Sequence, residues 1–416
     1  MRPVVLSPFV HRLLHVIIFL FIPVAIVAPR IVVWEIIIGG LVGLYYSRKQ
    51  SLTQIPLPLN IIILMIPLWA LVTTLWAKYP ISSLMTSLKI LALVVLGLYW
   101  CRLTLSVPQQ TRKSLITALI VGFLFGLLFL IGDIWFKNPW QIFWGKSSAK
   151  ALAQGSLLIS LVAWPIILWV LRRPYSIYGR IGLLVSLLIS IFWVLLQIDC
   201  DTSFIGLFMG ICVFLGTLSF PRLTSFGMRL FVPIIIISFP FISLFAFKPE
   251  HIPTYNTYLH EISFIDRFYI WNDVAATILE HPWKGIGVDG TRYHEKNQEL
   301  REWQFIDEAG KKHKIQTQRF GIHPHNAILQ LWLELGFVGF ILGILLPCQV
   351  LRQIYCTNLS LVEKAVSSGL FTGVFLVVWV NLGFWQNWWI AALWIIVGLT
   401  ISMLKGRGEI SEKVYA

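Results

Sequence analysis

The chain alternates long apolar runs with short polar connections over most of its 416 residues. A membrane-spanning helix needs about 20 apolar residues, and twelve runs approach that length. The predicted spans are 10–28, 31–47, 57–77, 84–103, 114–136, 152–171, 180–198, 203–219, 226–247, 326–350, 363–385 and 388–404. Because lipid offers no partner to backbone N–H and C=O groups, each run is expected to be a helix. The pattern predicts an all-α integral membrane protein with about twelve transmembrane helices.

One polar interval interrupts this series. Residues 248–322 form a 75-residue connection that holds ten of the 33 Lys and Arg and eleven of the 19 Asp and Glu. With His323 and His325 at its end, it also holds seven of the nine histidines. The chain therefore divides into three parts: spans one to nine (1–247), a large loop that carries the active site (248–325), and three spans with a tail (326–416).

The stretch "FIDRFYIWNDVAATILEH" inside this loop has the spacing of an amphipathic helix. Its apolar face is formed by Phe268, Trp271, Ala275 and Ile278. Pro282 and the following glycines are typical of a helix end. The loop is therefore expected to be partly helical.

Charge distribution orients the spans. Only 12% of the residues are charged and 57% are hydrophobic, which excludes an ordinary soluble enzyme. With the N-terminus in the cytoplasm, the cytoplasmic connections and tails hold 17 Lys and Arg, against five in the short connections on the other side. Both termini are thus predicted to be cytoplasmic. Most of the net charge of +14 is then a topology signal, and no nucleic-acid partner is expected.

The segment "GIHPHNAILQLWLELG" places polar residues at the mouth of the tenth span. Pro324 favours an extended His323, and Asn326 is a good N-cap for a helix that begins near Ala327. His325 then lies at the positive end of a helix dipole, which favours a neutral imidazole able to accept a proton. The alternative is that this segment only caps the span.

A polar stripe continues along the same span. Asn326, Gln330 and Glu334 recur at four-residue steps, so they share one helix face that should point into the bundle. For Glu334, a role as a buried structural partner is the stronger alternative.

Other polar motifs are less specific. Arg267 offers a planar fork suited to phosphate oxygens, or a salt bridge to Asp266 or Asp273. "GIGVDG" at 285–290 matches a nucleotide-binding pattern but follows a helix, so a turn is expected. His323 and His325 are spaced too closely for a zinc pair, and no metal is predicted. The five cysteines form no CxxC pair and indicate neither a disulfide framework nor a metal site.

"RFYIWNDVAATILEHPWKGIGVDG", followed by "HPHNAILQLWLELGFVG", resembles the O-antigen ligase and polymerase superfamily of the bacterial inner membrane. The resemblance extends to the number of spans and the late loop. It implies a metal- and cofactor-independent, inverting glycosyltransferase of GT-C-like architecture. Its donor would be a glycan on undecaprenyl diphosphate, and its acceptor a sugar of lipid A–core on the periplasmic face.

The resemblance also assigns residues. It implies that His325 is the general base for the acceptor hydroxyl and that Arg267 holds the diphosphate. Asn326, His323, Arg292, Arg319 and Lys89 are the further candidates for substrate binding.

The sequence departs from the family at one point. Members often carry a second arginine in the turn before the eighth span, where this chain has Asp199 and Asp201. The second phosphate contact therefore has five candidates, which are Lys89, Lys146, Lys150, Arg292 and Arg319.

Alternative functions differ in their acceptor or in their class. An O-antigen polymerase or a glycan-to-protein ligase of the same superfamily would use the same donor. A transporter for a lipid-linked sugar needs ionisable residues or broken helices near the bilayer midplane. Apart from residues at the cytoplasmic ends of the predicted spans, only Glu35, Lys89, Asp133 and Glu334 are charged within them, which favours chemistry at the surface.

The charge bias generates a topology prediction. Single cysteines placed in residues 248–322 should react with a membrane-impermeant thiol reagent applied to intact spheroplasts, whereas cysteines between Arg172 and Arg180 should react only after lysis. The opposite labelling pattern would overturn both the orientation and the periplasmic site.

Overall fold

The structure is a computed structural model that describes residues 4–49, 55–137, 139–144, 146–198, 200–248, 259–306 and 311–404. Within these residues, eleven helices are long and apolar enough to cross a membrane, and Leu57–Thr73 is a shorter apolar helix. Together they match the twelve predicted spans. The chain is an all-α, multi-pass membrane protein, as the hydropathy pattern predicted.

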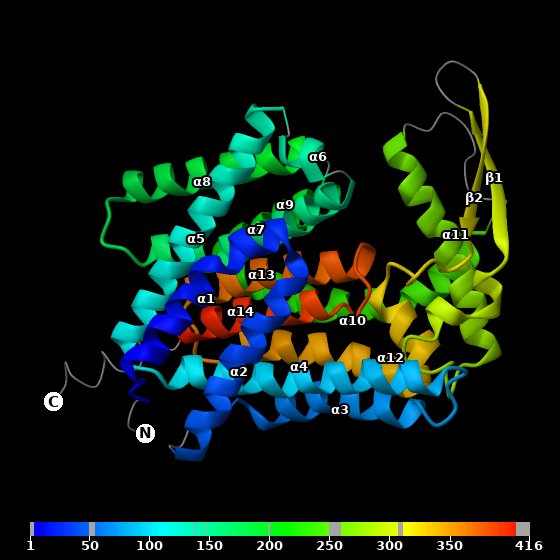
Figure 1. Ribbon diagram of the computed structural model, residues 1–416, viewed down its shortest axis with the longest axis horizontal. Coiled ribbons are helices and arrows are strands. Elements are labelled where there is room, and N and C mark those ends of the chain that lie inside the picture. The colour runs from blue at the N-terminus through cyan, green and yellow to red at the C-terminus, as the bar shows by residue number, and fades with distance from the viewer. Residues whose placement is uncertain are drawn as a thin grey trace.

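The helices follow the chain in an up-and-down order (Figure 1). Their bounds are α1 Pro8–Val27, α2 Val32–Lys49, α3 Leu57–Thr73, α4 Pro80–Ser106, α5 Gln109–Trp135, α6 Pro139–Trp144, α7 Lys146–Leu171, α8 Ile177–Gln197, α9 Asp201–Ser219, α10 Pro221–Ala246, α11 Leu259–Glu280, α12 Ala327–Tyr355, α13 Leu361–Val380 and α14 Asn387–Leu404. Two strands, β1 Leu300–Ile306 and β2 Lys312–Gln318, form an antiparallel hairpin.

The two ends of the bundle differ in character. The helix α11 and the hairpin project from one end, and α1 begins at the opposite end (Figure 1). At that opposite end, the Val4 N–H donates to the Ser106 carbonyl (2.8 Å) and the Arg112 guanidinium to the Ser402 carbonyl (3.2 Å). The start of α1 and the end of α14 therefore lie together. We call the end that carries α11 and the hairpin the loop face.

Small residues let α9 and α13 approach closely. A Cβ added to Gly210 would lie 2.9 Å from the Gly369 carbonyl oxygen, and one added to Gly206 would lie 3.5 Å from that of Gly373. Such contacts between small residues are a common basis of helix association in membranes. They bring the start of α9 and the end of α13 together at the loop face.

The loop contains the predicted helix and an unpredicted hairpin. Trp271, Ala275 and Ile278 are buried on α11, as their spacing predicted. The hairpin was not anticipated from the sequence. It is joined to α11 by Asp273, which forms ion pairs with Arg301 and Arg319.

The helix α12 is broken at Gly336, which has a positive φ of 66° and a ψ of −161°. The carbonyl groups released by the break accept hydrogen bonds from the loop and from α3. Their donors are the N–H groups of Ile286 and Gly287 and the indole of Trp69 (2.8–2.9 Å). The released N–H of Phe337 donates to the Trp283 carbonyl. The segment 283–287 therefore completes the hydrogen bonding of α12.

This break corrects the prediction of one continuous span at 326–350. Two other boundaries also move inwards, because α3 ends at Thr73 rather than at residue 77 and α13 ends at Val380 rather than at residue 385. The "GIGVDG" segment is a turn, as expected, and lies against the break in α12.

The break generates a stability prediction. A Cβ at Gly336 would lie 2.2 Å from the Trp283 carbonyl oxygen, and the positive φ adds strain of about 1–3 kcal/mol. Gly336→Ala should therefore lower the unfolding temperature of the purified protein, followed by its loss from the monodisperse size-exclusion peak on heating. Gly182→Ala is the matched control, because its Cβ would meet nothing within 4 Å. Equal unfolding temperatures would contradict the packing of 283–287 against the break.

Candidate functional site

Asn326 caps α12, as predicted, and also joins it to α13. Its side-chain oxygen accepts a hydrogen bond from the Leu329 N–H (3.0 Å), and its amide donates to the Trp379 carbonyl (2.9 Å). The side chain is fully buried. The cap therefore also fixes the end of α13 beside the segment 321–326, which we call the histidine loop.

His325 is held by the carbonyl group of Asn381 just beyond α13. A carbonyl oxygen only accepts, so the 2.8 Å contact requires a proton on Nδ1 of His325. In the neutral ring, the lone pair that accepts a proton is then on Nε2. The backbone φ of His325 is 52°, which is uncommon for residues other than glycine. Such conformations occur often at functional sites.

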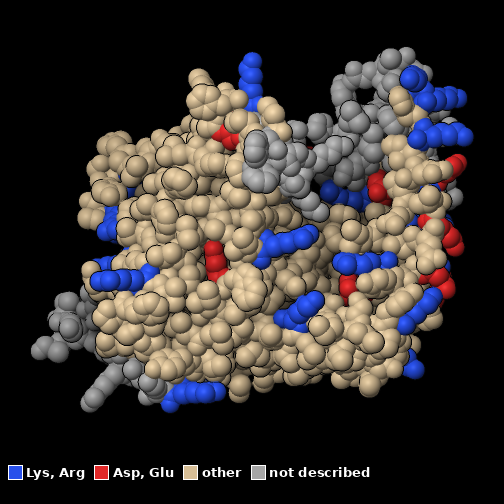
Figure 2. Space-filling view, in the orientation of Figure 1, with Lys and Arg blue, Asp and Glu red and all other residues tan. Residues whose placement is uncertain are grey.

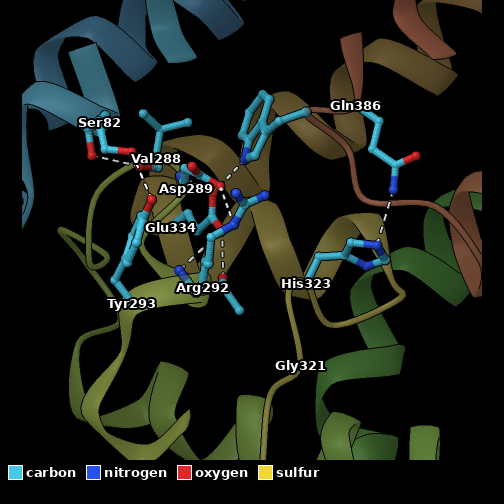
Figure 3. Close-up of polar contacts among 12 residues, drawn as sticks. Ser82, Val288, Asp289, Arg292, Tyr293, Gly321, His323, Glu334 and Gln386 are labelled. Atoms are coloured by element: carbon cyan, nitrogen blue, oxygen red, sulfur yellow. Dashed lines mark hydrogen bonds and ion pairs between the residues drawn. The ribbon is translucent and has the colours of Figure 1, made fainter. Parts of the chain in front are cut away.

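His323 lies against His325, with ring centroids 4.2 Å apart. Its Nδ1 accepts from the His325 N–H (3.3 Å), and its Nε2 lies 3.1 Å from the amide nitrogen of Gln386 (Figure 3). The ring also packs on Gly383, where an added Cβ would lie 2.7 Å from it. The Nδ1 contact thus stays within the histidine loop, and the contact of Nε2 with Gln386 holds that loop against the connection between α13 and α14.

The polar stripe of α12 points into the protein, as predicted. Gln330 accepts a hydrogen bond from the Phe384 N–H (2.8 Å) and donates to Glu334 (3.3 Å). Glu334 also accepts from the Asp289 N–H (2.7 Å), the Thr291 hydroxyl and the Trp385 indole. Figure 3 shows the Glu334 carboxylate, which α12 carries, directed toward the 288–292 segment. These contacts favour the structural role for Glu334.

Arg267 lies on α11, one helical turn before the residue by which that helix contacts the histidine loop. Four residues later on the same helix face, the Trp271 indole donates to the Pro324 carbonyl (2.9 Å). Burial lowers the pKa of the Arg267 guanidinium, whereas the nearby carboxylates of Asp201 and Asp266 raise it. A partly buried cation one helical turn from this contact is suited to an anionic ligand.

The other candidate cations lie beside carboxylates. Arg319 forms ion pairs with Asp273 (3.2 Å) and with Glu299 (2.8 Å). Arg292 lies 3.8 Å from Asp289. Burial raises the pKa of Asp289, whereas Arg292 and Lys89 lower it. Asp273 is thus engaged by the hairpin, and of the two predicted salt-bridge partners it is Asp266 whose charge acts on Arg267.

Several contributors to the site were missed by sequence reasoning. The Asn381 carbonyl and the Gln386 amide belong to "NLGFWQN"; Asn381 falls within the predicted span 363–385, and only Gln386 and Asn387 lie in the predicted connection after it. Asp201 was noted as a departure from the family, and the structure places it within electrostatic reach of Arg267. Asp199 and the side chains of Lys146 and Lys150 lie outside the described part of the chain.

An apolar cavity of about 600 Å³ reaches this site from within the bundle. Residues from α3, α4, α12, α13 and α14 line it. At the loop face it is bounded by Ala327 and Ile328, directly after the histidine loop, and by Trp379 and Phe384, on either side of Asn381. Leu404 and Thr357 line its other end. The cavity therefore extends along the bundle and ends beside His325.

Comparison with known proteins agrees with this architecture. Residues 178–344 match the family described as O-Antigen ligase. A protein of Rickettsia conorii named "Putative polysaccharide ligase" is 30% identical over 362 residues, which are 84% of this chain and 81% of the relative. A protein of the same name from Rickettsia bellii is 29% identical over 79% of this chain and 76% of its own length. The matched region includes α11, the hairpin, the histidine loop and the break in α12.

Proposed function

Because this chain belongs to the O-antigen ligase superfamily, we propose that it transfers a glycan from undecaprenyl diphosphate to a sugar hydroxyl of lipid A–core. The reaction is placed at the periplasmic face of the bacterial inner membrane, with both termini in the cytoplasm. In this proposal, the three parts defined from the sequence (1–247, 248–325 and 326–416) are a membrane unit, an active-site loop and a second membrane unit.

The observation that carries the proposal is the apolar cavity that ends beside the histidine loop. A lipid-linked donor has an apolar tail, a diphosphate and a polar glycan. Its tail suits a cavity lined mainly by apolar side chains, and its diphosphate would then lie where that cavity meets His325 and Arg267. The bond to be broken would therefore lie at the boundary between lipid and water.

The chemistry follows from the hydrogen bonds of His325. With its proton on Nδ1, held by the Asn381 carbonyl, the ring can take the proton of an acceptor hydroxyl on Nε2. The hydroxyl oxygen attacks the anomeric carbon from the side opposite the diphosphate, so the bond to the diphosphate breaks with inversion. Arg267 stabilises the charge that collects on the departing diphosphate. The reaction as proposed needs neither a metal nor a cofactor.

The remaining candidates take supporting roles. His323 and Asn326 orient the histidine loop, and we assign Lys89, Arg292 and Arg319 to the substrate glycan. Their neighbouring carboxylates offset the positive charge that would favour a diphosphate, but their N–H groups still suit sugar hydroxyls.

The break in α12 bears on the transporter alternative. In transporters, backbone groups released by broken helices bind the cargo near the bilayer midplane. Here the carbonyls of Leu333, Glu334 and Leu335 all accept hydrogen bonds from the protein itself. Transfer at the loop face therefore accounts better for the break than passage does.

Transfer with purified protein tests the function. The protein is mixed with a defined glycan on undecaprenyl diphosphate and either lipid A–core or a second lipid-linked glycan. Product on lipid A–core supports the ligase, and product on the second glycan supports a polymerase. Movement of the donor across proteoliposomes without any product would support the transporter.

The two histidines should differ in this assay. Loss of a general base costs about 10²–10⁴ in rate, so His325→Ala should nearly abolish transfer while donor binding is kept. His323→Ala should reduce transfer much less, because that ring only positions the loop. His15→Ala on α1 serves as the control. An active His325→Ala with an inactive His323→Ala would reverse the assignment.

Arg267→Lys should lose most of its activity. A guanidinium can bind two phosphate oxygens at once, whereas an ammonium acts as a point charge. The loss should appear in the donor titration of the transfer assay, and Arg222→Lys at the other end of the bundle should behave as wild type. If Arg267→Lys had wild-type kinetics, Arg267 would not bind the diphosphate, and its role would be to balance the nearby charges of Asp201 and Asp266.

A further inference from the structure

A second cavity, of about 320 Å³, lies at the loop face and shares no lining residue with the apolar one. One wall is the connection between α3 and α4, with Trp76, Tyr79 and Ser83. The other wall is the segment from 281 to 295. We propose that this cavity binds one sugar unit of a glycan substrate, at a distance from the reacting bond. The inference rests on the proposed function, because it assumes that the substrates are glycans.

Aromatic rings from both walls suit the apolar faces of a sugar. Tyr79 and Tyr293, one from each wall, pack against each other with ring centroids 4.8 Å apart and line the cavity together, and Trp76 adds a third ring. The negative face of an aromatic ring attracts the weakly positive C–H groups of a pyranose. Ligand sites typically combine such rings with a few polar groups.

The polar groups of the cavity favour a neutral, hydroxyl-rich ligand. Lys78 and Glu295 form an exposed ion pair (3.4 Å) across its rim, so their charges balance. Burial and the charge of Lys296 lower the pKa of His294, which keeps this ring neutral. The cavity therefore offers both donors and acceptors without the net positive charge that a diphosphate requires.

One aromatic ring of the cavity wall also carries a buried donor. The Trp76 indole N–H is buried and, among the described residues, has no hydrogen-bond partner. Buried polar groups in native proteins nearly always have a partner. The N–H is not exposed to the cavity, so a sugar hydroxyl would accept from it only if the indole ring turned. The hydroxyl of Tyr293 points toward Ser82 on the opposite wall (Figure 3).

The cavity has a fixed position relative to His325. Its 285–290 wall is held on α12 by the hydrogen bonds of Ile286 and Gly287, and by the Asp289 N–H bond to Glu334. Glu334 lies nine residues after His325, which corresponds to about 14 Å along a helix. The bound sugar would therefore be a neighbour of the reacting unit within a short oligosaccharide. Such a site selects substrates without taking part in the chemistry.

Kinetics with full-length protein in nanodiscs test the proposal. Initial rates are measured while the lipid-linked donor and the lipid A–core acceptor are varied separately. Tyr79→Ala and Tyr293→Ala should raise KM for one substrate by roughly three- to tenfold and leave kcat close to wild type. The substrate affected identifies whether the sugar belongs to the donor or to the acceptor. Tyr175→Ala is the matched control, because Tyr175 and Tyr79 are each 44% exposed and Tyr175 lies outside the cavity.

Glu295→Gln keeps the test decisive if an aromatic variant does not fold, because Glu295 is an exposed rim residue and its loss should raise the same KM. Binding is also measured directly by saturation-transfer NMR on the His325→Ala protein. The two probes are the core oligosaccharide and the donor glycan, each released from its lipid. Tyr79→Ala or Tyr293→Ala, combined with His325→Ala, should weaken the NMR signal of the bound sugar, and this result supports the cavity as a sugar site. It would do so even if the wild-type protein showed no glycosyltransferase activity, because that outcome refutes only the proposed function. Unchanged KM values for both substrates and unchanged saturation transfer would overturn the cavity as a sugar site while leaving the ligase intact.

Discussion

The backbone groups released where α12 breaks at Gly336 must find partners, and the arrangement of the loop face depends on how they do so. In lipid or in a protein interior, an unpaired carbonyl or N–H costs several kcal/mol. The segment 283–287 meets this requirement by hydrogen bonding along the break. It thereby fixes the course of the chain from α11 to the hairpin, and with it the wall of the second cavity. Gly285 and Gly336 make the contact possible, because a Cβ on either would overlap the other segment.

The polar stripe of α12 organises the other side of the site. The end of α13 and the connection to α14 are contacted by all three residues of this stripe, Asn326, Gln330 and Glu334. His323 in the histidine loop also contacts this connection. These contacts convert a short, otherwise irregular connection into a rigid support for His325. Polar side chains at this depth are costly unless they are paired. Their pairing explains why the stripe can lie inside an otherwise apolar bundle.

The sequence alone predicted the features that depend on local periodicity. The spans, the amphipathic face of α11, the Asn326 cap and the inward stripe all follow from spacing along one helix. The break at Gly336 was not predictable in this way, because its partners lie about fifty residues earlier in the chain and a glycine in a membrane helix usually serves packing. The hairpin was also missed, since its strands are short and rich in charged residues. The role of the Asn381 carbonyl required knowing that the end of α13 lies beside the histidine loop.

The contact between His325 and Asn381 has a consequence for genetics. The atom that orients the imidazole is a main-chain oxygen, and every amino acid supplies the same oxygen at that position. Substitution scans would then report residue 381 as tolerant, although the proposed reaction would depend on it. Only a change that moves the main chain, such as an insertion or deletion in the 381–386 connection, would expose the dependence. An essential contact of this kind would escape any survey that reads importance from side-chain identity.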